Sequence, residues 1–140
     1  MTDNLTIKQR KHTMTRVRSK GTGPELIVRR TVFRLGYRYR LHRKDLPGKP
    51  DLVFAGRRKI IFVHGCFWHG HEGCPASRRP ASNVDYWEKK LDRNMERDRR
   101  NIEQLEKEGW RVLVIWECQT KEGKHLERII QHFLEDSYHG

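Results

Sequence analysis

The chain has 140 residues, a formal net charge of +12 and an apolar fraction of 35%. This length predicts one domain with its own hydrophobic core, and the excess of basic residues favours a polyanionic partner. Because the sequence has neither an apolar run of about 20 residues nor the apolar core of a signal peptide, we expect a cytoplasmic protein with no membrane partner.

Residues 1–20 are a basic segment with little hydrophobic periodicity. They contain one acidic residue, Asp3, and six basic ones: Lys8, Arg10, Lys11, Arg16, Arg18 and Lys20. A solvated terminus and an arm laid along nucleic acid both fit this composition. We therefore expect an N-terminal arm over residues 1–20 and a single domain over residues 21–140.

A helix is predicted to begin near Pro24, because proline suits the first helical position, and to end at Gly36. The next residues, 37–41, alternate like an edge strand. Two short β-rich runs, 51–54 and 59–63, are joined by four residues and are typical of a hairpin. The apolar face of the helix comprises Val28, Val32 and Leu35.

A second, longer helix is predicted from about residue 83 to residue 108, before Gly109. Its apolar residues step by three or four, as one helix face requires. They are Trp87, Leu91, Met95, Ile102 and Leu105. Asp98 lies in the same row, where an acid is costly unless it is paired or solvated. Either Asp98 lies at the edge of the row and reaches solvent, or it is a carboxylate of a functional site.

The last part of the chain is predicted to contain a strand and an amphipathic helix. Residues 111–116 are a continuous apolar run, which is typical of a central buried strand. The apolar face of the helix comprises Leu126, Ile129, Ile130 and Phe133. The order helix, strands, helix, strand, helix predicts an α/β fold with helices around a mixed sheet.

The chain has three cysteines, Cys66, Cys74 and Cys118. An odd number cannot close a disulfide framework, and a tetrahedral structural zinc site needs four ligands. The fourth ligand would be a histidine of the segment 64–74, where His71 lies between two of the cysteines. Three unrelated buried thiols are the alternative, but the density of cysteine and histidine in this segment favours structural zinc.

With His71 assigned to zinc, His64 and His69 are available for acid–base chemistry, because imidazole titrates near neutral pH. Phe67 and Trp68, which directly follow a candidate zinc ligand, are either packed inside the protein or face a partner. On a strongly basic chain, stacking on bases or insertion between base steps competes with core packing.

Two acids are candidates for the same site. Asp51 begins a strand directly after a proline, where it can cap the strand or hold a divalent cation for phosphodiester hydrolysis. Glu25 lies in the first turn of the first helix, where its interaction with the helix dipole alone is also favourable. The residue types leave both alternatives open.

Together these segments resemble the very short patch repair (Vsr) endonucleases, a branch of the PD-(D/E)xK nucleases. The matching segments occur in order and with family spacing over about residues 12–120: MTRVRSKGTGPE, LPGKPDLVF, FVHGCFWHGHEGC, YWEKK, N..RD and GWRVLVIWEC. The second acid and the lysine of the wider superfamily are missing at Phe62, Val63 and His64, as they are in this branch. The chain departs from the branch itself at Val63, where members often have threonine.

The resemblance implies a restriction-endonuclease-like fold, with a three-layer α/β core, a mixed central sheet flanked by helices, and a structural zinc site. It implies catalytic Mg²⁺ bound by Asp51 and the backbone carbonyl of Val63. His69 would be the general base that activates water. His64, supported by Glu25, would stabilise or protonate the leaving group.

The resemblance assigns roles to the remaining candidates as well. Asp98 would lie behind the catalytic residues and hold them in position without contacting the substrate. The zinc ligands would be Cys66, His71, Cys74 and Cys118. The aromatic side chains that wedge into the duplex would be Phe67, Trp68 and Trp87, and the N-terminal arm would lie in the minor groove.

The implied function is a monomeric, Mg²⁺-dependent endonuclease for DNA repair. It would nick double-stranded DNA 5′ of the thymine in a T:G mismatch, which arises when 5-methylcytosine deaminates. Mismatch-repair proteins would be further partners. The alternatives are a nicking or restriction endonuclease of related fold with another target, and a non-catalytic zinc-stabilised DNA-binding module.

Overall fold

The computed structural model describes residues 23–136, which contain four strands and three α-helices. The helices are α2 (Gly23–Arg34), α3 (Val84–Lys107) and α4 (Gly123–Glu135). The strands are β1 (Arg40–Leu41), β2 (Leu52–Phe54), β3 (Lys59–His64) and β4 (Arg111–Trp116). None of the helices in this part of the chain is long and apolar enough to cross a membrane. The basic arm predicted over residues 1–20 lies outside the described residues.

The four strands form one mixed sheet in the order β1-β2-β3-β4. β1 pairs antiparallel with β2, and β2 pairs antiparallel with β3. β3 pairs parallel with β4, and α3 lies in the crossover connection that a parallel pair requires. The predicted hairpin and the predicted edge strand are therefore confirmed.

β4 lies at the opposite edge of this sheet, so the prediction of a central strand for residues 111–116 is wrong. Ile115 packs into the core on one face, while Val112 and Val114 pack against the core on the other. A strand covered by helices on both faces needs apolar residues on both sides, wherever it lies in the sheet. The continuous apolar run indicates this double coverage and not a central position.

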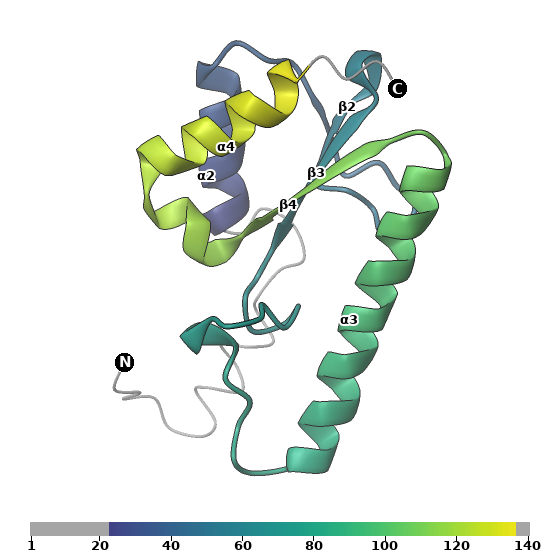
Figure 1. Cartoon of the computed structure of the whole chain (residues 1–140), viewed down its shortest axis with the longest axis vertical. Helices are drawn as coiled ribbons and strands as arrows, with labels where there is room; N and C mark the ends of the chain where they lie inside the picture. The colour runs from purple at the N-terminus through teal and green to yellow at the C-terminus, as the bar shows by residue number, and fades with distance from the viewer. Residues whose placement is uncertain (1–22, 137–140) are drawn as a thin grey trace.

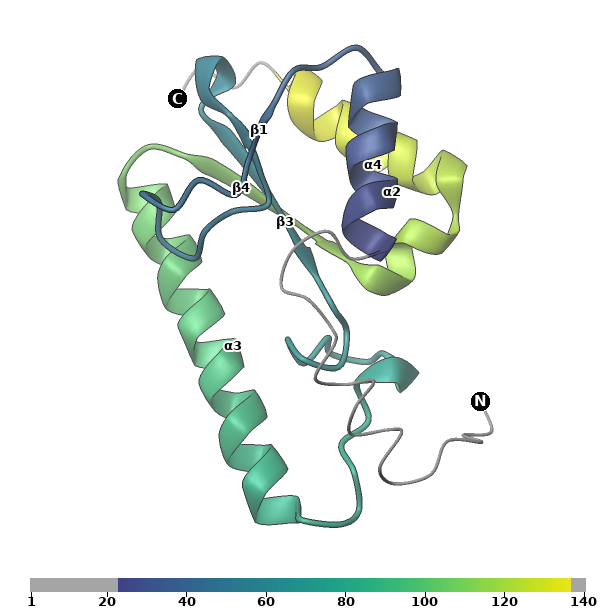
Figure 2. The ribbon, with the colours of Figure 1, turned by 180° about the vertical axis from the view of Figure 1, so that it is seen from behind.

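Helices on both faces of the sheet give the fold three layers (Figures 1 and 2). On one face, α2 and α4 bury their apolar sides against the sheet through Val28, Val32, Leu126, Ile130, Leu52 and Ile61. On the other face, Leu105 of α3 and Trp110 pack against Val53, Ile60 and Phe62. Full burial of each such aliphatic side chain contributes roughly 1.5–3 kcal/mol. The α/β architecture with a mixed sheet between helices is confirmed.

Only part of α3 covers the sheet. Its buried residues are Leu91 and Leu105, and its N-terminal half runs past the sheet, alongside the loop that follows β3 (Figure 1). Met95, predicted to face the core, is 40% exposed. The regular apolar row is correct for the helix, but in this half it faces a loop instead of the sheet, because the strands end there.

Candidate active site

Asp51 is a buried carboxylate just before β2, and the hairpin places it beside Val63 of β3. Its Oδ2 accepts a hydrogen bond from the backbone N–H of Val63 at 2.7 Å. The N–H and C=O of one strand residue point to the same side of the strand, so the carbonyl of Val63 also points to the side where Asp51 lies. The two oxygen ligands expected for Mg²⁺ therefore occur on the same side of β3.

Glu25 and His42 lie next to Asp51. Nε2 of His42 is 3.0 Å from Oε1 of Glu25 and 3.9 Å from Oδ1 of Asp51. Burial raises the pKa of Asp51 to about 7; the N–H of Val63 opposes this shift, and the neighbouring Glu25 adds to it. Two buried acids in contact are unfavourable while both are charged, and a bound cation would relieve that repulsion. This donor set fits a divalent metal ion.

His69, in the loop after β3, forms a hydrogen bond with Asp98 of α3. The distance from Nδ1 to Oδ2 is 2.6 Å, and both side chains are half-buried. Asp98 is thus paired and does not reach out to solvent from the edge of the helix. When Nδ1–H donates to Asp98, Nε2 of His69 keeps a lone pair that can accept a proton. The pair has the arrangement of an oriented general base.

His64 stacks on His69, with the ring centroids 3.9 Å apart. Burial, together with the neighbouring His69, lowers the pKa of His64 to about 3. The ring of His64 is therefore neutral at pH 7. The two histidines and Asp98 line a cavity of about 430 Å³ together with Ile102 and Trp116. A reacting group in this cavity would meet one neutral imidazole and one imidazole held by a carboxylate.

The expected support of His64 by Glu25 is not what the structure shows. The carboxylate of Glu25 lies against His42, and its other oxygen is 3.6 Å from Arg29. Val63 packs against the core under α2 and α4, so the next side chain in the strand, His64, points to the opposite face. Glu25 belongs to α2, which covers the other face of the sheet, so its carboxylate cannot contact the side chain of His64. The contacts of His64 are with His69 and Trp116 instead.

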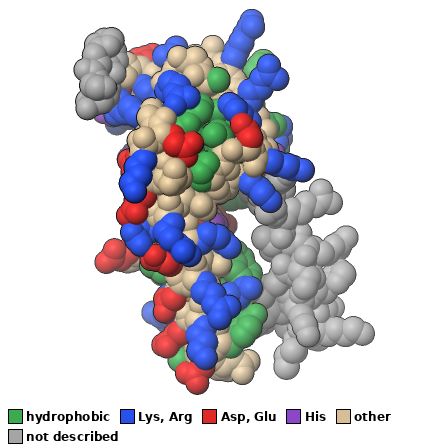
Figure 3. Space-filling model, turned by 90° about the vertical axis from the view of Figure 1, so that its right-hand side faces the viewer, with side chains coloured by type: hydrophobic (Ala, Val, Ile, Leu, Met, Phe, Trp, Pro, Cys, Tyr) green, Lys and Arg blue, Asp and Glu red, His purple; other side chains and the backbone are tan. Residues whose placement is uncertain are grey.

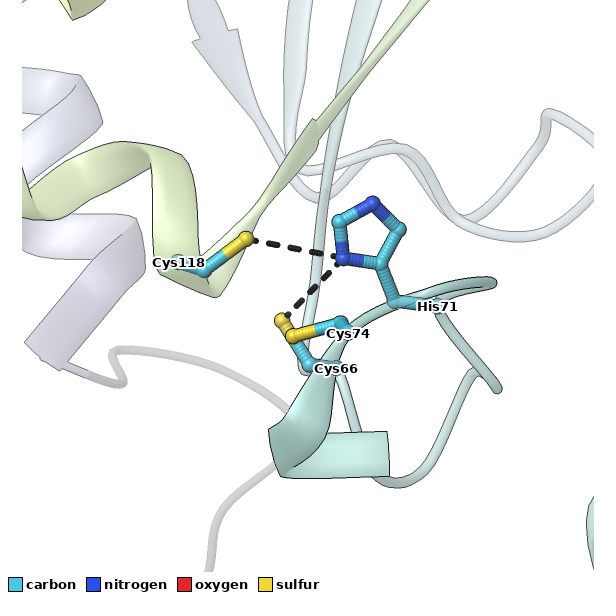
Figure 4. A group of neighbouring side chains, drawn as sticks. All are labelled: Cys66, His71, Cys74 and Cys118. Carbon is cyan, nitrogen blue, oxygen red and sulfur yellow. Dashed lines mark hydrogen bonds between the residues drawn. The ribbon is translucent and has the colours of Figure 1, made fainter. Parts of the chain in front are cut away.

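The four predicted zinc ligands converge at the ends of β3 and β4 (Figure 4). Their ligand atoms lie within 4.8 Å of one another; the residues are Cys66, His71, Cys74 and Cys118. Nδ1 of His71 is 3.6 Å from Sγ of Cys66 and 3.5 Å from Sγ of Cys118. In a tetrahedral zinc site, with Zn–S of about 2.3 Å and Zn–N of about 2.0–2.1 Å, a sulfur and a nitrogen ligand lie about 3.6 Å apart. The side chains therefore have the spacing of a closed zinc site.

Burial raises the pKa of the Cys66 thiol to about 12. Zinc binds the thiolate, so the ion would displace this proton and supply the charge that stabilises the buried sulfur. Gly70 lets the loop turn between His69 and His71 with φ +63°. A Cβ at this position would lie 2.5 Å from Sδ of Met95. Close packing on α3 thus fixes the segment that carries both histidines.

The three aromatic residues predicted to meet DNA lie together. The ring centroid of Phe67 is 5.1 Å from that of Trp68 and 5.3 Å from that of Trp87. All three are half-buried, and Tyr86, at the first turn of α3, packs on Trp87 with 56% of its surface exposed. The cluster lies outside both core clusters. Its rings contact one another at a loop and a helix end, an arrangement that can present aromatic rings to a partner.

Two residues of these clusters, His42 and Tyr86, are not identified by the sequence patterns. His42 follows a short strand and belongs to no motif, yet the antiparallel pairing of β1 with β2, in which Leu41 faces Leu52, places it opposite Asp51. Tyr86 precedes Trp87 in the YWEKK segment, but it lies off the apolar row of the helix. The available signal for Tyr86 is its position next to Trp87, whereas the sequence around His42 contains none.

Comparisons with known proteins identify relatives that are DNA endonucleases. The sequence matches the family model of the DNA mismatch endonuclease Vsr over residues 2–74. It is 50% identical to the type II nicking enzyme V.XorIIP of Xanthomonas oryzae pv. oryzae, over 98% of this chain and 100% of that protein. It is 45% identical to the type II nicking enzyme V.NmeAIP of Neisseria meningitidis, over 86% of both chains. The DNA mismatch endonuclease Vsr of Escherichia coli is 47% identical over 59% of this chain and 53% of its own length.

Proposed function

The chain belongs to the family of the DNA mismatch endonuclease Vsr, and from this premise we propose that it nicks double-stranded DNA 5′ of the thymine in a T:G mismatch. Two consecutive residues of β3 carry the proposal. Val63 contacts a buried carboxylate, Asp51, and His64 stacks on the His69–Asp98 pair. A cation site and an oriented base at the same strand end are the two components that metal-assisted phosphodiester hydrolysis requires.

In this proposal, Asp51 and the carbonyl of Val63 would hold Mg²⁺, which would supply the polarisation of the phosphoryl oxygen. His69 accepts the proton of the attacking water at Nε2, because Nδ1–H is held by Asp98. Asp98 fixes the tautomer and stabilises the positive ring that forms. His64 is neutral at pH 7, so it acts on the leaving oxygen as an N–H donor.

Base pairing at a T:G mismatch is weaker than in a matched pair, so opening the stack there costs less. The aromatic cluster of Phe67, Trp68, Trp87 and Tyr86 supports recognition by insertion at this point. Such mismatches arise when 5-methylcytosine deaminates. The proposed biological role is therefore repair of that lesion.

The test uses the zinc-loaded chain, Mg²⁺ and end-labelled duplexes that carry each mismatch or none. We expect a nick on the thymine strand of the T:G duplex, 5′ of the thymine, with matched duplexes intact. The relatives named type II nicking enzymes favour a second candidate, a nicking endonuclease with a target other than the T:G mismatch. Nicking of matched duplexes would support that candidate, and no nicking at all would support a non-catalytic binding module.

Replacing Trp68 by alanine should weaken binding to mismatched DNA by about 1–3 kcal/mol, the usual value of a base–aromatic contact. Affinity for matched DNA should change less, because inserting the tryptophan ring between matched base pairs costs more free energy. The measurement is the affinity for both duplexes together with thermal melting. Trp110→Ala is the control, since Trp110 is 6% exposed and packs in the core; it should lose stability of roughly 3–5 kcal/mol. A similar melting loss for Trp68→Ala with unchanged discrimination would contradict insertion.

Deleting residues 1–20 should weaken binding to any duplex and flatten its dependence on salt. The segment carries six basic residues, and each phosphate that the protein no longer neutralises reduces the slope of log K against log salt by about 0.9. Arg99→Ala is the control, because its guanidinium is already paired with Glu96 and Glu103 on α3. Figure 3 shows one face of the molecule, on which basic and acidic side chains are intermixed. A slope that stays constant after the deletion would show that the arm does not touch the phosphates.

A further inference from the structure

His42 is held directly opposite Asp51 by the pairing of β1 with β2. The register joins Leu41 to Leu52, and the next pair is closed by a hydrogen bond from the N–H of His42 to the carbonyl of Asp51 at 3.2 Å. The backbone of His42 is left-handed, with φ +47°, which is uncommon for a residue other than glycine. Such conformations are concentrated at functional sites, where the surrounding structure maintains them.

The imidazole of His42 reaches the same two carboxylates that line the cation site. Its Nε2 lies 3.0 Å from Glu25 and 3.9 Å from Asp51, and the three ligand atoms are all within 4.8 Å of one another. In octahedral coordination with bonds of about 2.1 Å, neighbouring ligand atoms lie about 3.0 Å apart and opposite ones about 4.2 Å. The distances of 3.0 Å and 3.9 Å from Nε2 of His42 to the two carboxylates lie between these two values. Arg29 is 3.6 Å from the other oxygen of Glu25, so it does not occupy the oxygen that faces His42.

We propose that His42 is a nitrogen ligand of the cation held by Asp51, and that this ligand makes the site select Mn²⁺ over Mg²⁺. Imidazole binds Mg²⁺ poorly, because that ion demands oxygen ligands, whereas first-row transition ions accept nitrogen. The inference rests on the proposed function only in taking Asp51 as the metal-binding acid. It adds a ligand and a metal preference that a carboxylate and a carbonyl alone would not give.

The test measures binding of Mn²⁺ to the full-length, zinc-loaded chain by electron paramagnetic resonance, with Mg²⁺ as competitor. The wild type should bind one Mn²⁺ that Asp51→Asn does not bind, and its spin echo should carry the modulation of a directly bound nitrogen. In His42→Gln the affinity for Mn²⁺ should fall at least tenfold and the nitrogen signal should vanish, while the affinity for Mg²⁺ changes less than threefold. His42→Asn is the second variant, because asparagine tolerates the left-handed backbone. His125→Gln, an exposed histidine of α4, is the control and should bind as the wild type does.

An Asp51-dependent Mn²⁺ without a nitrogen signal, or an affinity that is unchanged in both His42 variants, would overturn the proposal. A nitrogen signal that persists in Asp51→Asn would place the ion at His64 and His69 and would overturn it as well. Nicking of mismatched DNA is measured separately. A chain that nicks but lacks the nitrogen signal contradicts only the assignment of His42. A chain that shows the signal and never nicks contradicts only the proposed function.

Discussion

Replacing Asp51 by asparagine should abolish DNA nicking while leaving the affinity for mismatched DNA nearly unchanged. The carboxylate is the buried charge at the candidate cation site, and asparagine keeps its shape and its capacity to accept the N–H of Val63. Loss of the cation removes several kcal/mol of transition-state stabilisation, which corresponds to a rate on the order of 10³-fold lower. The measurement is the single-turnover nicking rate with saturating enzyme.

Asp45→Asn is the matched control for this variant. Asp45 lies in the loop before Asp51, but its carboxylate is exposed and paired with Arg43. Its substitution should leave the nicking rate within a factor of about two, since such surface pairs contribute roughly 0–1 kcal/mol. Thermal melting should show that Asp51→Asn is folded, because removing a buried charge relieves its desolvation. Equal nicking rates for Asp51→Asn and the wild type would exclude the cation site assigned here.

Local patterns predicted most of the elements that build this site. The hairpin that brings Asp51 to Val63 follows from two β-rich runs and a short loop, and the helix row showed that Asp98 is either paired in a functional site or reaches solvent from the edge of the row. Its partner, His69, comes from a loop 29 residues away. The pattern therefore left both alternatives open, and only the fold shows that Asp98 is paired and that its partner is His69.

Properties that depend on long-range pairing could not be predicted in the same way. The edge position of β4 depends on strand order, and a run that is apolar on both sides is the same at the edge and at the centre. The separation of Glu25 from His64 depends on which face α2 covers, and β3 alternates between the faces from one residue to the next. A one-residue difference in register would reverse this result. The position of His42 opposite Asp51 also depends on register, because the pairing of β1 with β2 brings the two residues together.

Replacing Cys118 by serine should release zinc and cost much of the stability of the chain. Cys118 follows β4, while the other three candidate ligands lie in the loop after β3, so Cys118 is the ligand through which a bound zinc ion would join the loop to β4 (Figure 4). Zinc binding to closed sites of this kind contributes on the order of 10–16 kcal/mol in small zinc-binding peptides, and here part of that energy would stabilise the fold. The measurement is elemental analysis of the purified chain together with its melting temperature. One zinc per wild-type chain is expected, and none in the variant.

The matched control for Cys118→Ser is Ser77→Ala, in the same loop. The Ser77 hydroxyl donates to the carbonyls of His71 and Cys74 but is not among the ligands. Its loss should lower stability by about 1 kcal/mol, the usual net value of a hydrogen bond, and should leave the zinc content at one. Nicking should be lost in Cys118→Ser as well, because His69 lies between two ligands and depends on the loop for its position. A Cys118→Ser chain that melts like the wild type and still nicks would mean that the cysteines are buried thiols without a metal.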